Sequence, residues 1–208
     1  MSYTIPMRKG DLMSIDECYG RVLSIQSHVV YGYVGNKAAV FPLQTLGFDV
    51  DIVNSVHFSN HTGYDGGFEG DILQGDQLRL ILKGLERNHL LTETRHLLTG
   101  YIGSVSFLRS VIDVIKKLKE VTGGQVRYVC DPVMGDDSKF YVPKELVQVY
   151  RDEVIPLADV ITPNSFEIEA LTGIKIKVID DALKACRCLH DKGPQMVIIT
   201  SMELEDNK

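Results

Sequence analysis

The sequence predicts an α/β fold in which a mostly parallel central sheet carries helices on both of its faces. Two observations support this expectation. Short apolar segments rich in β-branched residues alternate along the chain with longer segments whose apolar residues recur at helical spacing. The short segments end in polar residues, as strands of a parallel sheet do at the edge where ligands bind. We find neither an internal repeat nor a linker-like stretch, so we expect one domain over residues 21–208.

The first half of the chain should supply the first three long strands and the helices between them. The apolar patterns predict strands at 21–27, 49–56 and 96–99, and helices at 37–46, 75–88 and 104–122. The polar, glycine-rich stretch at 58–70 is too long for a tight turn. We therefore expect a functional loop or a small flap there.

The rest of the chain is organised around residues 128–137, which read Tyr-Val-Cys-Asp-Pro-Val-Met-Gly-Asp-Asp. The apolar run ends at Asp131, and Pro132 has no N–H with which to continue a strand. Gly135 lets the backbone turn, and Asp136 follows it. We therefore expect a buried strand at 126–130 that delivers carboxylates to a loop at its C-terminal end.

A second strand end of the same design follows at Thr162, where Pro163 and Asn164 precede a helix that begins near Glu167. The remaining patterns predict helices at 143–151, 165–171 and 180–192, and strands at 160–162 and 196–200. Pro143 suits the first turn of its helix, because a proline there loses no backbone hydrogen bond.

The bulk composition argues against several classes of protein. A formal net charge of −6 disfavours a nucleic-acid partner, which needs a basic face. No apolar run approaches the roughly 18 residues of a membrane span, and residues 1–20 lack the apolar centre of a secretory signal. We interpret 1–20 as a flexible leader and expect a cytoplasmic protein whose four cysteines, Cys18 among them, stay reduced.

The carboxylates at the predicted sheet edge are the candidates for chemistry. Asp131 and Asp136 on a glycine-containing loop can hold a hard cation, although an Asx-turn with a solvated charge accounts for the same residues. Asn164 and Glu167 form a capping-box pattern, which is structural. The same helix N-terminus would also favour an anion, and Glu167 could orient a metal-bound water there.

Two other polar groups carry weaker signals. His57 and His61 are four residues apart, but the surrounding sequence is typical of a loop and offers no third ligand, so a metal site is disfavoured. Ser27 has no evident acid that would complete a catalytic triad with His28. We expect Ser27 to donate a hydrogen bond to a ligand instead.

Several of these blocks together resemble the pyridoxal kinase family, within the ribokinase-like superfamily, and the resemblance runs from Arg21 to about Ser201. The blocks are Ser-Ile-Gln-Ser-His-Val at 24–29, Gly-Tyr-Val-Gly-Asn at 32–36, Phe-Ser-Asn-His-Thr-Gly-Tyr at 58–64, Leu-Thr-Gly-Tyr at 98–101, Cys-Asp-Pro-Val-Met-Gly-Asp at 130–136 and Ile-Thr-Pro-Asn-x-Phe-Glu at 161–167. The resemblance implies a ribokinase-like fold. It also implies transfer of the γ-phosphoryl group of ATP to the 5′-hydroxyl of pyridoxal, pyridoxine or pyridoxamine.

The resemblance also implies roles for single residues. Ser27 and Thr62 match residues that contact the polar groups of the pyridine ring, and Val34, Phe58 and Tyr101 match residues that wall the ring. The positions that match the surroundings of ATP are Asp131, Asp136, Tyr141, Asn164, Glu167, Thr200 and Ser201. Asp131, Thr162 and Glu167 are the implied metal-binding residues. Family members typically use Mg²⁺, often with K⁺, and are homodimers.

The sequence departs from the family pattern in one important respect. The family carries a Gly-Thr-Gly-Asp motif whose amides cradle the phosphates and whose Asp takes the alcohol proton, and residues 1–208 contain no such motif. We therefore expect the C-terminal part of the kinase domain to be missing and the family's catalytic base to lie beyond Lys208. We assign no catalytic base within the sequence and expect little or no kinase activity from it alone.

Two alternatives stay open at this point. A non-catalytic vitamin-binding or regulatory chain would keep the predicted pocket without turnover. A hydroxymethylpyrimidine kinase-like enzyme would share the fold, but the block at 58–64 favours pyridoxal. A smaller departure is the loop at 137–139, which has no glycine where relatives often have one, so we expect it to be less flexible.

Overall fold

The central sheet of the computed structural model, which describes residues 20–136 and 139–204, has seven strands in the order β3-β2-β1-β4-β5-β8-β9. The strands are β1 (Arg21–Val29), β2 (Asp49–Phe58), β3 (Gly70–Ile72), β4 (Thr94–Thr99), β5 (Arg127–Cys130), β8 (Val160–Ile161) and β9 (Met196–Val197). Every neighbouring pair is parallel except β2 with β3, which is antiparallel. The predicted mostly parallel sheet is therefore confirmed.

Some of the sequence-based expectations fall outside the described residues. These are the predicted leader except Gly20, together with its Cys18, and the loop residues 137–138. The last four residues, up to Lys208, are outside them as well. The expectation that the family's catalytic base lies beyond Lys208 is therefore not tested by the structure and stays a prediction.

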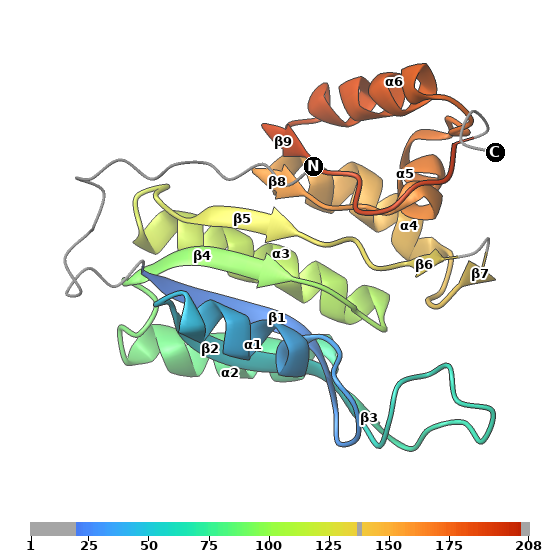
Figure 1. Cartoon of the computed structure of the whole chain (residues 1–208). Coiled ribbons are helices and arrows are strands. Elements are labelled where there is room, and N and C mark those ends of the chain that lie inside the picture. Colours follow the sequence, from blue (N-terminus) through green and yellow to red (C-terminus); the bar gives the residue numbers. More distant parts are fainter. Residues whose placement is uncertain (1–19, 137–138, 205–208) are drawn as a thin grey trace, which may run out of the picture.

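Helices lie on both faces of the sheet, as predicted. Figure 1 shows α1 (Asn36–Thr45) in front of β1 and β2, while α2 (Gly75–Arg87) and α3 (Val105–Val121) lie behind the sheet. The step from β1 to β2 runs in one direction across the sheet and the step from β2 to β4 runs back past β1. Because crossover connections are right-handed, this reversal puts the connecting helices on opposite faces. The remaining helices are α4 (Glu145–Val149), α5 (Ser165–Thr172) and α6 (Ile179–His190).

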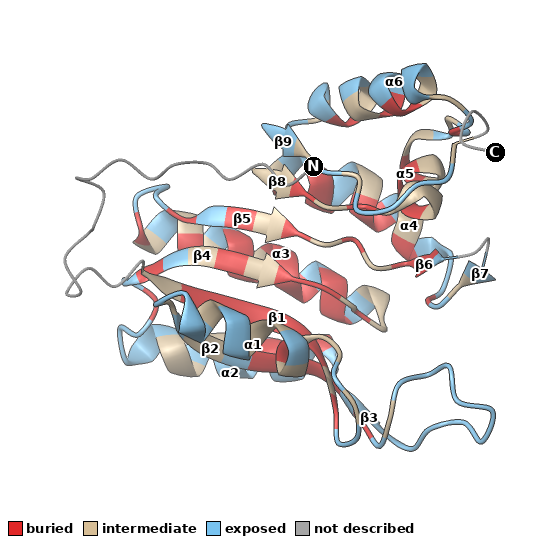
Figure 2. Cartoon of the chain, in the orientation of Figure 1, coloured by how far each residue is buried: buried red, intermediate tan, exposed pale blue. Residues whose placement is uncertain are grey.

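The core lies between α3 and the middle strands. Figure 2 shows the buried residues concentrated in β1, β4 and β5 and on the side of α3 that faces them. Leu108, Val111 and Leu118 of α3 are fully buried, at helical spacing, against Ile25 of β1 and Leu97 of β4. Each such side chain contributes about 1.5–3 kcal/mol by leaving water, so this layer fixes the carboxyl edge of the sheet. None of the helices in the described part of the chain is long and apolar enough to cross a membrane.

The structure differs from the sequence-based expectation in its short elements. The helix predicted at 143–151 ends as α4 at Val149 and continues as a π-helical turn, Tyr150–Val154, and a 3-10 turn, Ile155–Leu157. Pro156 explains the change, because its ring lacks an N–H and clashes with the carbonyl four residues earlier in an α-helix. The strand predicted at 196–200 is shorter, since only Met196–Val197 pair regularly with β8.

Candidate functional site at the carboxyl edge of the sheet

A cavity of about 220 Å³ opens at the carboxyl edge of the sheet, where β1, β2, β4 and β5 end. It is lined by Gln26, Ser27, Val29, Val34, Gly35, Val56, Phe58, His61, Thr62, Tyr101, Asp131, Val133 and Tyr141. The five residues predicted to contact a pyridine ring are all among them. The structure thus brings together residues from four separate segments of the chain.

One side of the cavity is an apolar wall formed by Val29, Val34, Val56, Phe58 and Tyr101. The side chains of Val29, Val56 and Phe58 are buried and pack together, and those of Val34 and Tyr101 pack against them. The ring of Phe58 also contacts that of Phe68, with their centroids 4.5 Å apart. This wall therefore presents an apolar surface of three valines and two aromatic rings, formed mainly by packing.

Ser27 and Gly35 meet at the end of the apolar wall. Gly35 has φ +49°, and a Cβ at this position would lie 2.3 Å from the carbonyl oxygen of Ser27 and 2.4 Å from its Oγ. Only glycine therefore lets the loop before α1 close over Ser27. Asn36 then anchors that loop: its Oδ1 accepts a hydrogen bond from Ser24 Oγ (2.7 Å), and its Nδ2 donates to the carbonyl oxygen of Val53 (3.0 Å).

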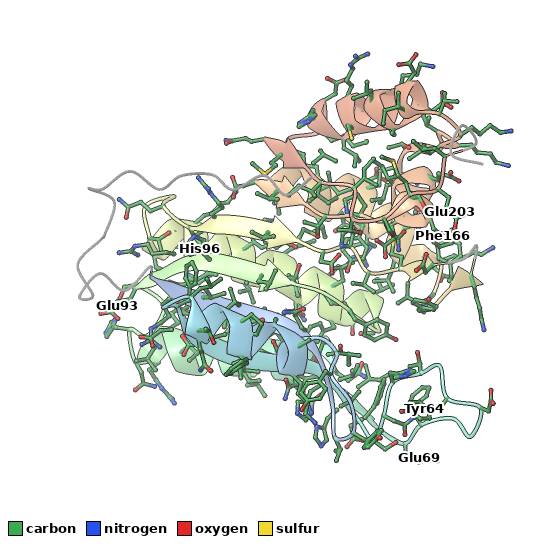
Figure 3. All side chains as sticks on the ribbon, in the orientation of Figure 1. Tyr64, Glu69, Glu93, His96, Phe166 and Glu203 are labelled. Carbon is green, nitrogen blue, oxygen red and sulfur yellow. The ribbon has the colours of Figure 1, made fainter. Side chains whose placement is uncertain are left out.

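The loop at 59–69 forms the mouth of the cavity. Its two ends are joined, because Ser59 N–H donates to the carbonyl oxygen of Glu69 (2.8 Å) and Glu69 N–H donates to Ser59 Oγ (3.1 Å). Figure 3 shows Tyr64 and Glu69 on this loop, away from the sheet. His61 and Thr62 line the cavity from the loop, although both are exposed. The predicted loop is therefore present, and two of its residues line the cavity.

The two histidines that the sequence places four residues apart have separate partners. His57 Nδ1 lies 2.9 Å from Nδ1 of His28 on the neighbouring strand, and the two rings are nearly parallel. His61 Nδ1 accepts a hydrogen bond from the N–H of Gly63 (3.1 Å).

Asp131 also lines the cavity. It follows β5 directly, and its Oδ1 accepts a hydrogen bond from Thr162 Oγ1 (3.2 Å), which follows β8. Burial raises the pKa of Asp131 to about 6, and the hydrogen bond from Thr162 acts in the opposite direction. The carboxylate is thus held partly out of water, in a place where a cation would compensate it.

Glu167 is buried and joins two segments that are distant in the sequence. Its Oε1 accepts a hydrogen bond from the N–H of Met134 (2.9 Å), and its Oε2 accepts one from the N–H of Asn164 (2.9 Å). Asn164 in turn caps α5 by accepting from the N–H of Glu167 (2.8 Å), and its Nδ2 donates to the carbonyl oxygen of Gly135 (2.8 Å). The predicted capping box is confirmed, and it also fixes the loop that follows Asp131.

The pKa of Glu167 is raised to about 7, first by burial and also by the charge of Asp131, against the effect of its backbone hydrogen bonds. Asp131, Thr162, Asn164 and Glu167 form what we call the carboxylate cluster. The described residues contain no group of three or more His, Cys, Asp or Glu side chains that could hold a metal ion. Mg²⁺ commonly takes only one or two carboxylates and completes its shell with water and phosphate oxygens. The cluster therefore fits Mg²⁺ as a partial set of oxygen ligands.

The other residues predicted around a nucleotide lie on both sides of this cluster. Tyr141 lines the cavity, and its N–H donates to the carbonyl oxygen of Met134 (2.8 Å). Asp136 lies in the short strand β6 (Gly135–Asp136), which pairs with β7 (Lys139–Phe140). On the other side, the N–H of Thr200 donates to the carbonyl oxygen of Pro163 (3.0 Å). The carbonyl oxygen of Ser201 accepts a hydrogen bond from the N–H of Ser165 (2.9 Å). The predicted residues thus surround the N-terminus of α5.

Sequence reasoning missed several residues that line the cavity, namely Gln26, Val29, Gly35, Val56, His61 and Val133. Most of them are immediate neighbours, or next neighbours, of residues that were predicted. The alternation of side chains along a strand would identify which neighbours share a face, but only once the register of β1 against β2 is known.

Comparison with known proteins gives consistent results. The family model described as phosphomethylpyrimidine kinase matches residues 90–208. The chain is 60% identical over 185 residues to a pyridoxal kinase of Arabidopsis thaliana, covering 89% of this chain and 59% of that protein. It is 50% identical over 193 residues to the Homo sapiens pyridoxal kinase, covering 91% of this chain and 60% of that protein. The chain thus spans less than two thirds of the length of these relatives.

A solved structure extends the comparison to three dimensions. The pyridoxal kinase of Leishmania donovani, in complex with ADP and pyridoxamine, superposes with a TM-score of 0.86 at 41% sequence identity. The superposition covers 90% of this chain and 66% of that one. The agreement in fold therefore includes the strands, loops and helices that form the cavity.

Proposed function

Because the chain belongs to the phosphomethylpyrimidine kinase family, we propose that it acts in the ATP-dependent phosphorylation of pyridoxal, pyridoxine or pyridoxamine at the 5′-hydroxyl. The observation that carries the proposal is the cavity, which is lined both by the apolar wall and by the carboxylate of Asp131. The names of the relatives support a B6 vitamer as the substrate, and the ADP complex of the Leishmania enzyme supports ATP as the phosphoryl donor.

We propose different tasks for the apolar wall and for Asp131. Val34, Phe58 and Tyr101 would hold the pyridine ring by packing, while Ser27 and Thr62 would hydrogen-bond its polar substituents. A ring held this way is oriented by shape and excludes water from one side. Its 5′-hydroxyl could then approach Asp131.

The carboxylate cluster would serve the nucleotide. We propose that Asp131, Thr162 and Glu167 bind Mg²⁺, directly or through water, and that the ion neutralises phosphate charge during transfer. Asp136, Tyr141, Asn164, Thr200 and Ser201 would surround ATP near the N-terminus of α5, where the helix dipole favours anions. The resemblance adds three further proposals: K⁺ as a second cation, a homodimer and a cytoplasmic location.

The direct test is to incubate the purified chain with Mg-ATP and pyridoxal and to measure pyridoxal 5′-phosphate. We expect slow turnover at most, because no residue of the sequence is assigned as the base. Formation of product that requires ATP and stops in Asp131→Asn would support the proposal. Neither product nor saturable pyridoxal binding, from a preparation shown to be folded by a cooperative thermal transition, would contradict it.

A second candidate function is that of a vitamin-binding chain without turnover. It is favoured because the five residues predicted to contact the pyridine ring, Ser27, Val34, Phe58, Thr62 and Tyr101, all line this cavity. Saturable binding of pyridoxal in calorimetry, with no product formed from Mg-ATP, would identify this function.

The family match also indicates a second alcohol that should be tested as the substrate. The family name, phosphomethylpyrimidine kinase, favours comparison with a hydroxymethylpyrimidine. We expect pyridoxal to bind more tightly, because the loop that carries His61 and Thr62 is the block specific to pyridoxal kinases. Tighter binding of the hydroxymethylpyrimidine would reverse this assignment.

A further inference from the structure

Gln26 lines the cavity but has no part in the function proposed above. Its side chain is buried, with 7% of the residue exposed, and its Nε2 donates a hydrogen bond to Ser24 Oγ (3.0 Å). Its Oε1 has no hydrogen-bond partner among the described residues. Because buried polar groups are nearly always paired, the unused end of this amide calls for an explanation.

Asn36 sets the direction of the hydrogen bonds that hold Gln26. The Nδ2 of Asn36 faces two backbone carbonyl oxygens, those of Val53 (3.0 Å) and of Gln26 (3.3 Å). Carbonyl oxygens only accept hydrogen bonds, so the end of Asn36 that faces them must be its NH₂ group. The other end, which faces Ser24, must then be the oxygen Oδ1.

Ser24 passes this direction on to Gln26. Its Oγ lies 2.7 Å from Asn36 Oδ1, so the single hydroxyl proton is donated to that oxygen. Towards Gln26 the hydroxyl can then only accept, which requires Nε2 rather than Oε1 at this contact. Asn36, Ser24 and Gln26 are all buried, so water competes little for these bonds. The relay from Asn36 through Ser24 therefore fixes Oε1 as the outward end of the Gln26 amide.

Gly100, which follows β4, provides the space in which Oε1 lies. A Cβ at Gly100 would be 2.7 Å from Oε1, so a side chain there would displace the amide. Among the described residues, the polar side-chain atoms that are both sealed from solvent and unpaired are Nδ1 of His96 and the hydroxyl of Tyr150. The Oε1 of Gln26 is unpaired but not sealed, and it is therefore open to the cavity that Gln26 lines.

We propose that Gln26 is a ligand-binding residue that selects a ring carrying a hydrogen-bond donor, such as a hydroxyl, an ammonium or a protonated ring nitrogen. Its Oε1 only accepts, and the relay keeps the amide from turning to offer its NH₂ group instead. A ring without a donor would leave Oε1 unpaired in a filled cavity, and sites of this kind reject such ligands strongly. Ser24 and Asn36 act through Gln26 and are positioning residues. The inference rests on the proposed function in one respect, namely that a B6 vitamer is the ring that supplies the donor.

The test uses two probes that differ in one donor, 3-hydroxypyridine and 3-methoxypyridine. Their affinities near neutral pH are measured by NMR titration, followed at the backbone N–H groups of Gly100 and Tyr101. We expect the original chain to bind the hydroxyl probe about tenfold more tightly than the methoxy probe. In Gln26→Met, which keeps the length of the side chain but lacks a strong acceptor, this preference should disappear.

Ser24→Ala tests the relay, and Ser110→Ala is its matched control. Ser110 is a fully buried serine of α3 that does not line the cavity, and its hydroxyl donates to the carbonyl oxygen of Ser106 (3.0 Å). In Ser24→Ala the amide of Gln26 is free to turn and offer its NH₂ group, to which the oxygens of both probes can accept. We therefore expect the preference to fall several-fold in Ser24→Ala and to stay unchanged in Ser110→Ala. A full preference in Ser24→Ala would contradict the relay.

Gly100→Ala provides a second variant, because its Cβ displaces Oε1 while Gln26 itself is retained. Gly103→Ala is the matched control, since a Cβ there makes only ordinary contacts, at 3.5 Å or more. The preference should be lost in Gly100→Ala and kept in Gly103→Ala. Equal affinity of the original chain for the two probes would overturn the proposal, and so would a preference that survives in both Gln26→Met and Gly100→Ala.

Titration of the original chain with pyridoxal separates this inference from the proposed function. A preference for the hydroxyl probe without pyridoxal binding would contradict the vitamin as the substrate and leave the role of Gln26 in place. Pyridoxal binding without a preference between the probes would do the reverse. Binding of neither pyridoxal nor either probe would contradict both.

Discussion

The apolar wall of the cavity and the carboxylate cluster next to it are built by different kinds of interaction. The apolar wall comes from the neighbouring strands β1 and β2 and the segments next to them, and it is held by packing. The carboxylate cluster comes from the ends of β5 and β8 and the start of α5, and it is held by hydrogen bonds to two desolvated carboxylates. The wall should therefore be sensitive to volume and insensitive to pH, and the cluster should show the reverse.

The largest effect should come from a change of volume at the wall. Gly35→Ala places a Cβ against Ser27 at a position with φ +49°, so both a clash and backbone strain arise. We expect it to lower the free energy of unfolding by about 3 kcal/mol and to abolish pyridoxal binding, as measured by urea unfolding and calorimetry.

Gly32→Ala is the matched control for this change. Gly32 has φ +94°, but a Cβ there would meet no atom within 4 Å. Gly32→Ala should therefore lower the free energy of unfolding only by the backbone strain, about 1 kcal/mol, and should still bind pyridoxal. Equal effects of the two substitutions would mean that closure over Ser27 does not shape the pocket.

The next largest effect should be the dependence of the free energy of unfolding on pH that comes from the carboxylate cluster. The pKa of Glu167 is about 7 and that of Asp131 about 6 in the folded chain, against ordinary values of 4.5 and 3.8. At pH values between the ordinary pKa and the folded-state pKa of each group, the folded state binds more protons than the unfolded state. This contribution to stability is therefore complete below about pH 4 and is lost as the pH rises through 7, by on the order of 3 kcal/mol for each group.

Urea unfolding between pH 4.5 and 8 would measure this loss, and Glu167→Gln should remove about half of it, because Asp131 keeps its own shift. The stacked pair of His28 and His57, which does not line the cavity, gives the opposite pH dependence, because the pKa of His28 is lowered, first by burial and then by the charges of His57 and Lys37. Stability tied to His28 is therefore lost as the pH falls below about 6.5. A Glu167→Gln variant with an unchanged profile would show that the cluster is not the source of the pH dependence.

A smaller effect should separate the structural part of the cluster from its binding part. Asn164→Ala removes the cap of α5, and Ser104→Ala removes the cap of α3, where Ser104 Oγ accepts from the N–H of Phe107 (3.2 Å). Each should cost about 1 kcal/mol of stability. Only Asn164→Ala should also weaken Mn²⁺ and ADP binding, and equal binding by both variants would contradict the proposed nucleotide site.

The same contrast explains how much the sequence could predict. Long, periodic elements such as β1 and α3 were predicted to within two residues, because many apolar positions define their faces. The short strands β3, β6 and β7 were missed, since two or three residues show no period. Asp131 and Glu167 were predicted because an apolar strand or a capping pattern marks them, whereas the bond from Met134 to Glu167 depends on packing that no local pattern encodes.

The smallest effect on stability should occur at Thr62, on the exposed loop at the mouth of the cavity. Thr62→Ala should change the free energy of unfolding by less than about 0.5 kcal/mol, because the side chain is exposed. It should still weaken pyridoxal binding roughly fivefold to tenfold, as expected for one lost hydrogen bond, and Thr62→Ser should restore most of the affinity. If Thr62→Ser bound as weakly as Thr62→Ala, the methyl group rather than the hydroxyl would be the contact, and packing would then govern the mouth of the cavity as well as its wall.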